Sequence, residues 1–136
     1  MSAATPPPGP GPLHVYEYAV IRVVPRVERA EFLNAGVVLW CRPVEFLGAL
    51  TADPSDRLRV LAPDADLDAV TRHVAAWEGV CAGTAGSGAG EAAGARFRWL
   101  TAPRSTVVQT SPVHCGRTAD PAGELRRLFT RLVVGR

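Results

Sequence analysis

The stretch that decides the fold spans residues 16–41 and reads YEYAVIRVVPRVERAEFLNAGVVLWC. Residues 16–24 are rich in Tyr, Val and Ile, which predicts a strand. Both faces of this strand are largely apolar, so we expect it to lie centrally in a sheet and to be covered on both sides. Arg22 is the exception. A guanidinium at that position needs a carboxylate or phosphate partner, because an unpaired buried charge is costly.

The residues after this strand predict a hairpin. Residues 25–30 have the character of a loop with a helical turn, and an alternating apolar pattern resumes at residue 31. We predict a second strand there, with a bulge or a tight backbone approach at residues 34–36. The alternative is a short helix over residues 28–33, capped at Asn34 or Gly36.

A third strand and two helices follow. Pro43 turns the chain, and residues 45–51 predict a strand that completes an antiparallel meander. Asp53-Pro54 is typical of a helix start and predicts a short helix to about residue 61. A longer helix over about residues 66–81 follows, capped at Asp64 or Asp66. Its apolar residues fall at helical spacing and form one stripe: Leu67, Val70, Val74, Trp77 and Cys81.

The C-terminal part predicts two more strands and a closing helix. Residues 97–102 and 106–111 are the strands, on either side of Pro103-Arg104. Asp120-Pro121 repeats the cap-and-proline signature and opens a helix over about residues 121–134. The predicted fold class is therefore α+β, with a mostly antiparallel sheet of about five strands and two principal helices, about 66–81 and 121–134.

Two low-complexity segments mark the limits of the domain. Residues 1–12, MSAATPPPGPGP, predict a disordered Pro/Gly-rich tail. Residues 82–95 hold a Gly/Ala-rich run that predicts a flexible loop. It lacks the Lys-Ser/Thr of a phosphate-binding loop and does not follow a predicted strand. We therefore expect a single domain over residues 13–136.

Composition places few limits on function. All 15 basic residues are Arg, and the net charge of +2 falls short of the basic character expected of a dedicated DNA-binding protein. The three cysteines cannot pair completely within one chain, which favours reduced thiols. No signal peptide and no apolar run long enough for a bilayer is visible. We expect a cytoplasmic protein.

The residue types of common catalytic and metal sites do not form known patterns here. His and Cys residues show neither a Cys-x-x-Cys pair nor a His-x-x-x-His pair, so we predict no metal site and no cofactor. His114 and Cys115 are neighbours, and neighbours on a strand point to opposite faces, so they cannot act as a catalytic pair by themselves. We name no catalytic residue, and we lean toward a protein that is not an enzyme.

One polar set is a candidate anion site. The predicted hairpin brings Glu31 and Asn34 near Arg22, with Glu31 or Glu28 as the arginine's partner. Arginine and hydroxyl donors at a turn suit an anionic ligand or a partner's carboxylate, although the simpler interpretation is that these side chains pair with neighbours and join the sheet. The full set is Arg22, Glu31, Asn34, Arg104, Ser105, Gln109 and Ser111.

The sequence resembles a bacterial family known only as domain of unknown function 3037. The resemblance rests on YAVIRVVP, EFLNAGVVLWC and RWLTAPRSTVVQTSPVHCG, followed by a C-terminal helix. It covers about residues 13–134 and includes the whole candidate polar set. It implies no established activity or cofactor. It does imply a partner, because members of that family are often encoded beside kinase-like proteins of the HipA type.

Three hypotheses follow from these patterns. The first is an accessory or regulatory protein that binds a protein partner through an Arg22/Arg104 surface or the C-terminal helix. The second is an enzyme or binding module for a phosphorylated or otherwise anionic ligand, with Arg22 and Arg104 as clamps and Glu31 as general base. The third is nucleic-acid binding through the arginines of the closing helix, which the mild net charge disfavours: Arg126, Arg127, Arg131 and Arg136.

Overall fold

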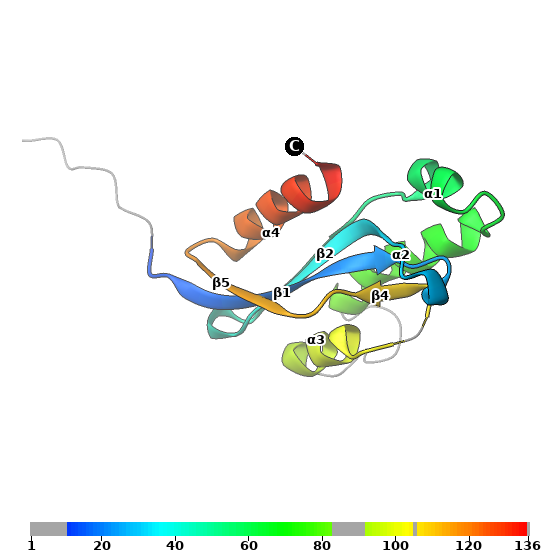
Figure 1. The fold of residues 1–136 in the computed structure, drawn as a ribbon. Helices are drawn as coiled ribbons and strands as arrows, with labels where there is room; N and C mark the ends of the chain where they lie inside the picture. Colours follow the sequence, from blue (N-terminus) through cyan, green and yellow to red (C-terminus); the bar gives the residue numbers. More distant parts are fainter. Residues whose placement is uncertain (1–10, 83–91, 105, 136) are drawn as a thin grey trace, which may run out of the picture.

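A central strand, β1, organises the sheet in the computed structural model, which describes residues 11–82, 92–104 and 106–135. In these residues the sheet order is β3-β2-β1-β4, and β5 also pairs with β1. Every pairing is antiparallel (Figure 1). The strands are β1 (His14–Val23), β2 (Leu33–Cys41), β3 (Phe46–Thr51), β4 (Val108–Thr110) and β5 (His114–Thr118). The helices are α1 (Ser55–Leu61), α2 (Leu67–Ala82), α3 (Ala93–Thr101) and α4 (Pro121–Phe129). The short turns are η1 (Val27–Arg29), η2 (Arg42–Val44) and η3 (Thr130–Val134).

The β1–β2 hairpin has the predicted bulge. Arg22 pairs with Asn34, whereas Ile21 pairs with Gly36, so one residue of β2, Ala35, is left out of the register. A Cβ atom at Gly36 would lie 2.7 Å from the Leu50 carbonyl oxygen on β3. Only glycine allows the two backbones to approach this closely, which explains the break in the β-branched pattern at this point.

The predicted helix starts are confirmed. Asp53, Asp66 and Asp120 each accept a hydrogen bond from a backbone N–H two or three residues further on, at 2.9, 3.1 and 3.1 Å. These bonds satisfy N–H groups that have no partner inside the helix. The predicted closing helix is also confirmed, as α4 followed by the wider turn η3.

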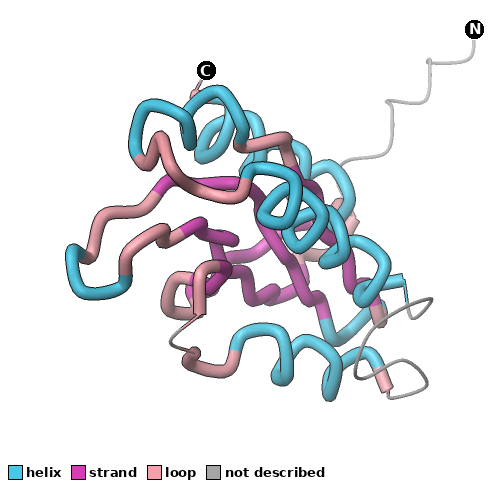
Figure 2. The backbone as a smooth tube through the Cα atoms, turned by 90° about the vertical axis from the view of Figure 1, so that its right-hand side faces the viewer, coloured by secondary structure: helices cyan, strands magenta, loops and turns pink. Residues whose placement is uncertain are grey.

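The sheet has a hydrophobic core on each face (Figures 1 and 2). Alternate residues of a strand point to opposite faces, so Ile21 and Val23 face the core formed with α1, α2 and α3, whereas Tyr16 faces the core formed with α4. The larger core includes Leu58, Val74, Trp77, Phe97, Leu100 and Val108. The smaller core includes Val37, Leu39, Cys41, Leu125, Leu128 and Val133.

Two local predictions in the C-terminal part are wrong. Residues 97–102 were expected to be a strand, but residues up to Thr101 belong to helix α3. Phe97 and Leu100 are fully buried at a spacing of three residues, which fits a helix face and not a strand face. The sequence analysis also missed β5, whose exposed or partly exposed residues HCGRT carry no apolar alternation.

The low-complexity segments lie mostly outside the described residues. This applies to residues 1–10 of the predicted tail and to residues 83–91 of the predicted Gly/Ala-rich loop. At the borders of that loop, α2 extends to Ala82 and α3 begins at Ala93. Residues 93–95 of the predicted loop are therefore helical.

Candidate functional site

Three residues of the predicted polar set form one row across the sheet. Arg22 on β1 pairs in register with Asn34 on β2 and with Gln109 on β4. Side chains that are directly opposite on antiparallel strands share a face of the sheet. Because Tyr16, six residues earlier on β1, faces α4, the Arg22 side chain also lies on the α4 side.

Arg22 has an aromatic neighbour instead of the expected carboxylate. Its Cζ atom lies 4.0 Å from the centroid of the Phe32 ring, in cation–π geometry, and the Phe32 side chain is 47% exposed. The Arg22 Nε atom is buried and has no hydrogen-bond partner. Within the described part of the chain, no acidic side chain forms an ion pair with this guanidinium.

A hollow lies beside this guanidinium. Its volume is about 230 Å³, which is room for several water molecules at about 30 Å³ each. We call it the Arg22 pocket. Two arms of the chain form it, the β1–η1–β2 region and strand β4. Its lining residues are Arg22, Val24, Val27, Ala30, Phe32, Gln109 and Thr110.

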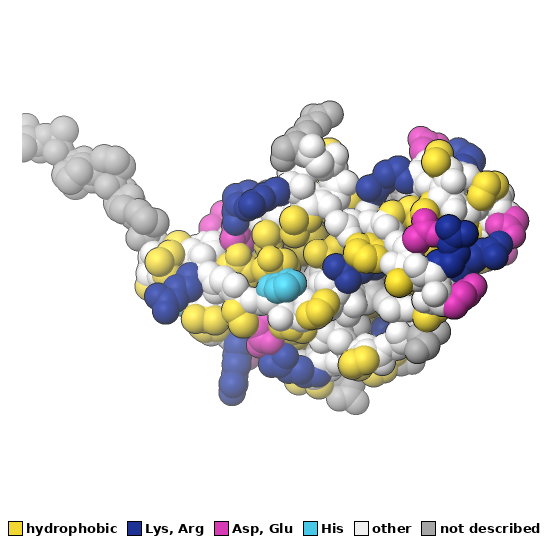
Figure 3. Space-filling model, viewed as in Figure 1, with side chains coloured by type: hydrophobic (Ala, Val, Ile, Leu, Met, Phe, Trp, Pro, Cys, Tyr) yellow, Lys and Arg dark blue, Asp and Glu magenta, His cyan; other side chains and the backbone are white. Residues whose placement is uncertain are grey.

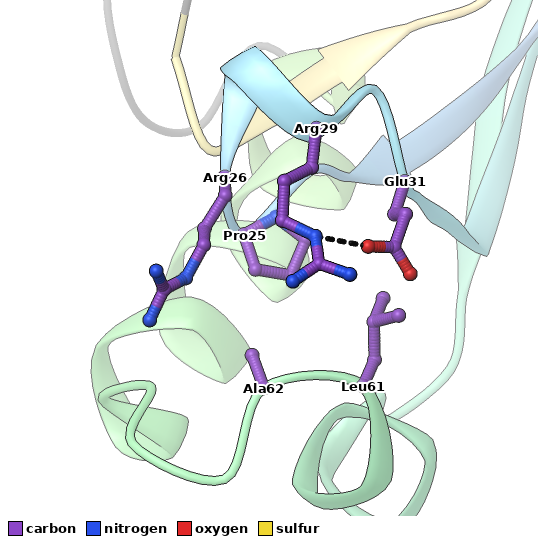
Figure 4. A pocket seen from close by; sticks show the side chains of 6 residues that line it. All are labelled: Pro25, Arg26, Arg29, Glu31, Leu61 and Ala62. Atoms are coloured by element: carbon purple, nitrogen blue, oxygen red, sulfur yellow. Dashed lines mark hydrogen bonds and ion pairs between the residues drawn. The ribbon is translucent and has the colours of Figure 1, made fainter.

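The predicted pairing of Arg22 with Glu31 or Glu28 is wrong. Glu31 accepts a hydrogen bond from Nε of Arg29, as Figure 4 shows, in a hollow of only about 30 Å³ against the end of α1. Arg26 in the same loop pairs with Asp64 at 3.3 Å. The hairpin loop satisfies Glu31 locally because η1 turns Arg29 back toward it.

Asn34 and Gln109 bind backbone carbonyl groups. Nδ2 of Asn34 donates to the Leu132 carbonyl at 3.0 Å and so ties β2 to η3, while its Oδ1 is buried without a partner. Nε2 of Gln109 donates to the Thr106 carbonyl at 2.6 Å. Both amides therefore help to hold the edges of the region around Arg22.

Arg104 lies elsewhere in the molecule. Its Cζ atom is 4.5 Å from the Trp99 ring centroid and 5.8 Å from that of Trp77, on α3 and α2. Its guanidinium donates to the Trp99 carbonyl, and burial lowers its pKa. Helices α2 and α3 pack on the sheet face opposite to Arg22, so the two arginines do not converge on one ligand.

The two serines of the predicted set have different outcomes. Ser111 is 3% exposed, and its hydroxyl accepts a hydrogen bond from the Val20 N–H at 2.8 Å. Its own N–H donates to the Val20 carbonyl at 2.8 Å. Ser111 thus continues the pairing along β1 between β4 and β5, and its role is structural. Ser105 lies outside the described residues.

A second polar cluster was not predicted. The hydroxyl of Tyr16, which is 4% exposed, donates to Glu124 on α4, and Glu124 also accepts two bonds from Arg127 at 2.6 and 2.8 Å. Burial and the nearby Glu124 carboxylate raise the pKa of Tyr16, and the hydrogen bond from Arg127 lowers that of Glu124. A strand tyrosine that pairs with a helix glutamate 108 residues away leaves no local signal in the sequence.

The arginines of the closing helix do not act as one group. Arg127 is engaged with Glu124, whereas Arg126 and Arg131 are exposed on α4 and η3. Arg136 lies outside the described residues. In the part of the chain that the structure describes, no group of three or more His, Cys, Asp or Glu side chains is arranged to hold a metal ion. None of the helices found there has the length and apolar character needed to cross a membrane.

The comparisons with known proteins identify the family. No curated protein and no solved structure matches the chain. The family described as "Protein of unknown function (DUF3037)" matches residues 18–133, which include β1, the Arg22 pocket and α4. The chain therefore belongs to the DUF3037 family of proteins of unknown function.

Proposed function

We propose that this protein is a non-enzymatic accessory or regulatory protein of the bacterial cytoplasm. Its role is to bind a protein partner. The observation that carries the proposal is Arg22, a strand arginine with no acidic partner among the described residues, stacked on the exposed ring of Phe32. Arginine and aromatic side chains are the residue types that dominate the binding energy of protein interfaces.

The uncovered part of the sheet supplies the rest of the surface. One helix, α4, packs on this face, whereas α1, α2 and α3 cover the other (Figure 1). Figure 3 shows apolar side chains gathered over the strands next to α4, with basic side chains around them. Tyr18 and His114 lie on this face, with their ring centroids 5.4 Å apart. We call the surface formed by Tyr18, Arg22, Phe32, Gln109 and His114 the open strand surface.

The proposed partner is a kinase-like protein of the HipA type, the class that the family resemblance brings with it. The Arg22/Arg104 surface expected from the sequence is replaced by the open strand surface, because Arg104 is engaged with two tryptophans on the other face. The enzyme hypothesis needed Arg22, Arg104 and Glu31 in one pocket, and these three residues have separate environments.

Co-expression with the kinase-like protein encoded beside the gene tests the proposal. A tagged partner should retain this protein through size-exclusion chromatography. Arg22→Gln should weaken the complex by at least about tenfold, as is typical of an interface arginine at a hot spot. The matched control is Arg72→Gln, which removes the same charge from the exposed side of α2 on the opposite face. Absence of a complex at micromolar concentrations, or an equal loss in both variants, would contradict the proposal.

A further inference from the structure

We propose that the Arg22 pocket binds a carboxylate group carried on a short apolar chain. The inference rests on the proposed function, because it names the chemical group of the partner that the open strand surface recognises. An acidic side chain, the C-terminus of a protein and a free carboxylic acid share this chemistry. Small acids can therefore test the site without the partner.

The first argument is the unsatisfied charge. Arg22 lies in the middle of the sheet, partly buried, with its Nε buried and unpaired. A buried N–H of a charged group that has no acceptor costs free energy, which an incoming acceptor oxygen restores. The neighbouring acids do not supply that oxygen. Glu31 is bonded to Arg29, and Glu28 is exposed without an ion pair to a described residue.

The second argument is geometric. Phe32 covers one face of the guanidinium plane and limits its movement. A stacked guanidinium still presents its edge, and that edge carries N–H donors spaced to match the two oxygens of a carboxylate. The ring therefore orients the edge toward a ligand and reduces the side-chain entropy that binding would otherwise cost.

The third argument separates a carboxylate from a phosphate. Arg22 is the only basic residue that lines the pocket among the described residues, and Gln109 adds an amide. A phosphate near pH 7 carries up to two charges, and its sites commonly gather several cations or backbone donors. The other lining side chains of the pocket are mostly apolar: Val24, Val27, Ala30 and Phe32. Such a lining suits a single negative charge attached to hydrocarbon.

An NMR titration of the arginine Nε–H resonances tests the site directly. The Arg22 signal is assigned by its disappearance in Arg22→Gln. The wild-type protein is titrated at constant ionic strength with formate, acetate, propionate and butyrate, each to about 0.1 M, which reaches well beyond millimolar affinity. We expect saturable shifts of the Arg22 signal, with affinity rising by up to about fourfold for each methylene that enters the apolar pocket.

Matched controls separate the charge from the hydrocarbon and the fold from the site. Butylammonium, with the same chain and the opposite charge, should leave the signal unmoved. Phe32→Leu should weaken butyrate binding by about threefold, since it removes an exposed cation–π contact. Phe32 is 47% exposed, so this variant should fold even if Arg22→Gln does not. Arg72→Gln should bind butyrate like the wild type.

Three outcomes would overturn the inference. They are no saturable shift with any acid, a larger and tighter response to phosphate than to butyrate, and a change of the Arg22 signal in Glu28→Gln without added acid. The last would show that the chain's own carboxylate occupies the site. Saturable acid binding combined with failure of the kinase-like partner to associate would reject the proposed function and leave the site intact. The reverse result would reject the site alone.

Discussion

The Tyr16–Glu124 hydrogen bond should contribute measurably to stability, and Tyr16→Phe isolates that contribution. The ring remains, so the substitution removes a hydroxyl without opening a cavity. The lost bond is buried and ends on a carboxylate, and such bonds are worth about 1.5–3 kcal/mol. Glu124 keeps its two bonds from Arg127, which places the expected loss at the lower end, about 1.5 kcal/mol.

Urea unfolding monitored by tryptophan fluorescence measures this loss. The matched control is Tyr18→Phe, two residues along the same strand, because the Tyr18 hydroxyl makes no hydrogen bond to a described residue. The control should change the free energy of unfolding by less than about 0.5 kcal/mol. A double-mutant cycle with Glu124→Gln should give a coupling of about 1 kcal/mol.

The same bond predicts a dependence on alkaline pH. Burial raises the pKa of Tyr16 in the folded protein above the unfolded value of 10.0. Its stabilising contribution is therefore complete below pH 10 and falls as the pH rises above 10, because only the unfolded state then loses the proton. The slope reaches at most about 1.4 kcal/mol per pH unit. No lysine titrates in this range, since the chain has none.

The expected pattern is that the deficit of Tyr16→Phe, relative to wild type, shrinks as the pH rises from about 10 to about 11. The reasoning fails if Tyr16→Phe and Tyr18→Phe lose the same free energy at pH 7. It also fails if the deficit of Tyr16→Phe grows above pH 10.

Three further predictions concern stability and thiol reactivity. Ser111→Ala should cost about 1–3 kcal/mol in urea unfolding, since it leaves the buried Val20 N–H without its hydroxyl acceptor, whereas Ser111→Thr should lose less; equal losses would argue against this role. Asp120→Ala should cost about 1 kcal/mol through loss of the helix cap, while Asp120→Asn should be nearly neutral, and a large loss in the latter would contradict capping. In the native protein at pH 8, a thiol reagent should modify one cysteine rapidly, and all three after unfolding, because burial raises the pKa of two of them, that of Cys81 to about 12. The reactive residue should be Cys115, and Cys115→Ser should abolish the rapid phase.

Gly116 shows how far tertiary contacts constrain a position that looks unremarkable in the sequence. It pairs with Tyr16 across β1 and β5, and a Cβ atom there would lie 2.5 Å from Cζ of that ring. The residue must be glycine because the tyrosine ring crosses its backbone on the way to Glu124. Nothing in the sequence HCGRT indicates that requirement.

The hairpin, the bulge and the helix caps were predictable because their causes are local. Alternation of apolar residues predicted β1 and β2, the glycine at position 36 marked the bulge, and Asp-Pro pairs marked two helix starts. Helices α2 and α4 followed from apolar residues at helical spacing. In each case the residues that determine the structure lie within a few positions of one another.

Other features depended on contacts between distant residues. Phe97 and Leu100 fit a strand by residue type, and their burial against the sheet selects the helix α3. Strand β5 forms because the N-terminal half of β1 presents an unpaired edge.

Within the candidate site, the sequence alone determined that Arg22 lies in a central strand beside Asn34, since strand pattern and hairpin register are set by local residues. Only the tertiary structure decided that Glu31 turns to Arg29, that Arg104 stacks on tryptophans of the opposite face, and that Phe32 covers Arg22. A charged side chain can reach several partners at similar cost, so its choice depends on the packed positions of residues far apart in the chain.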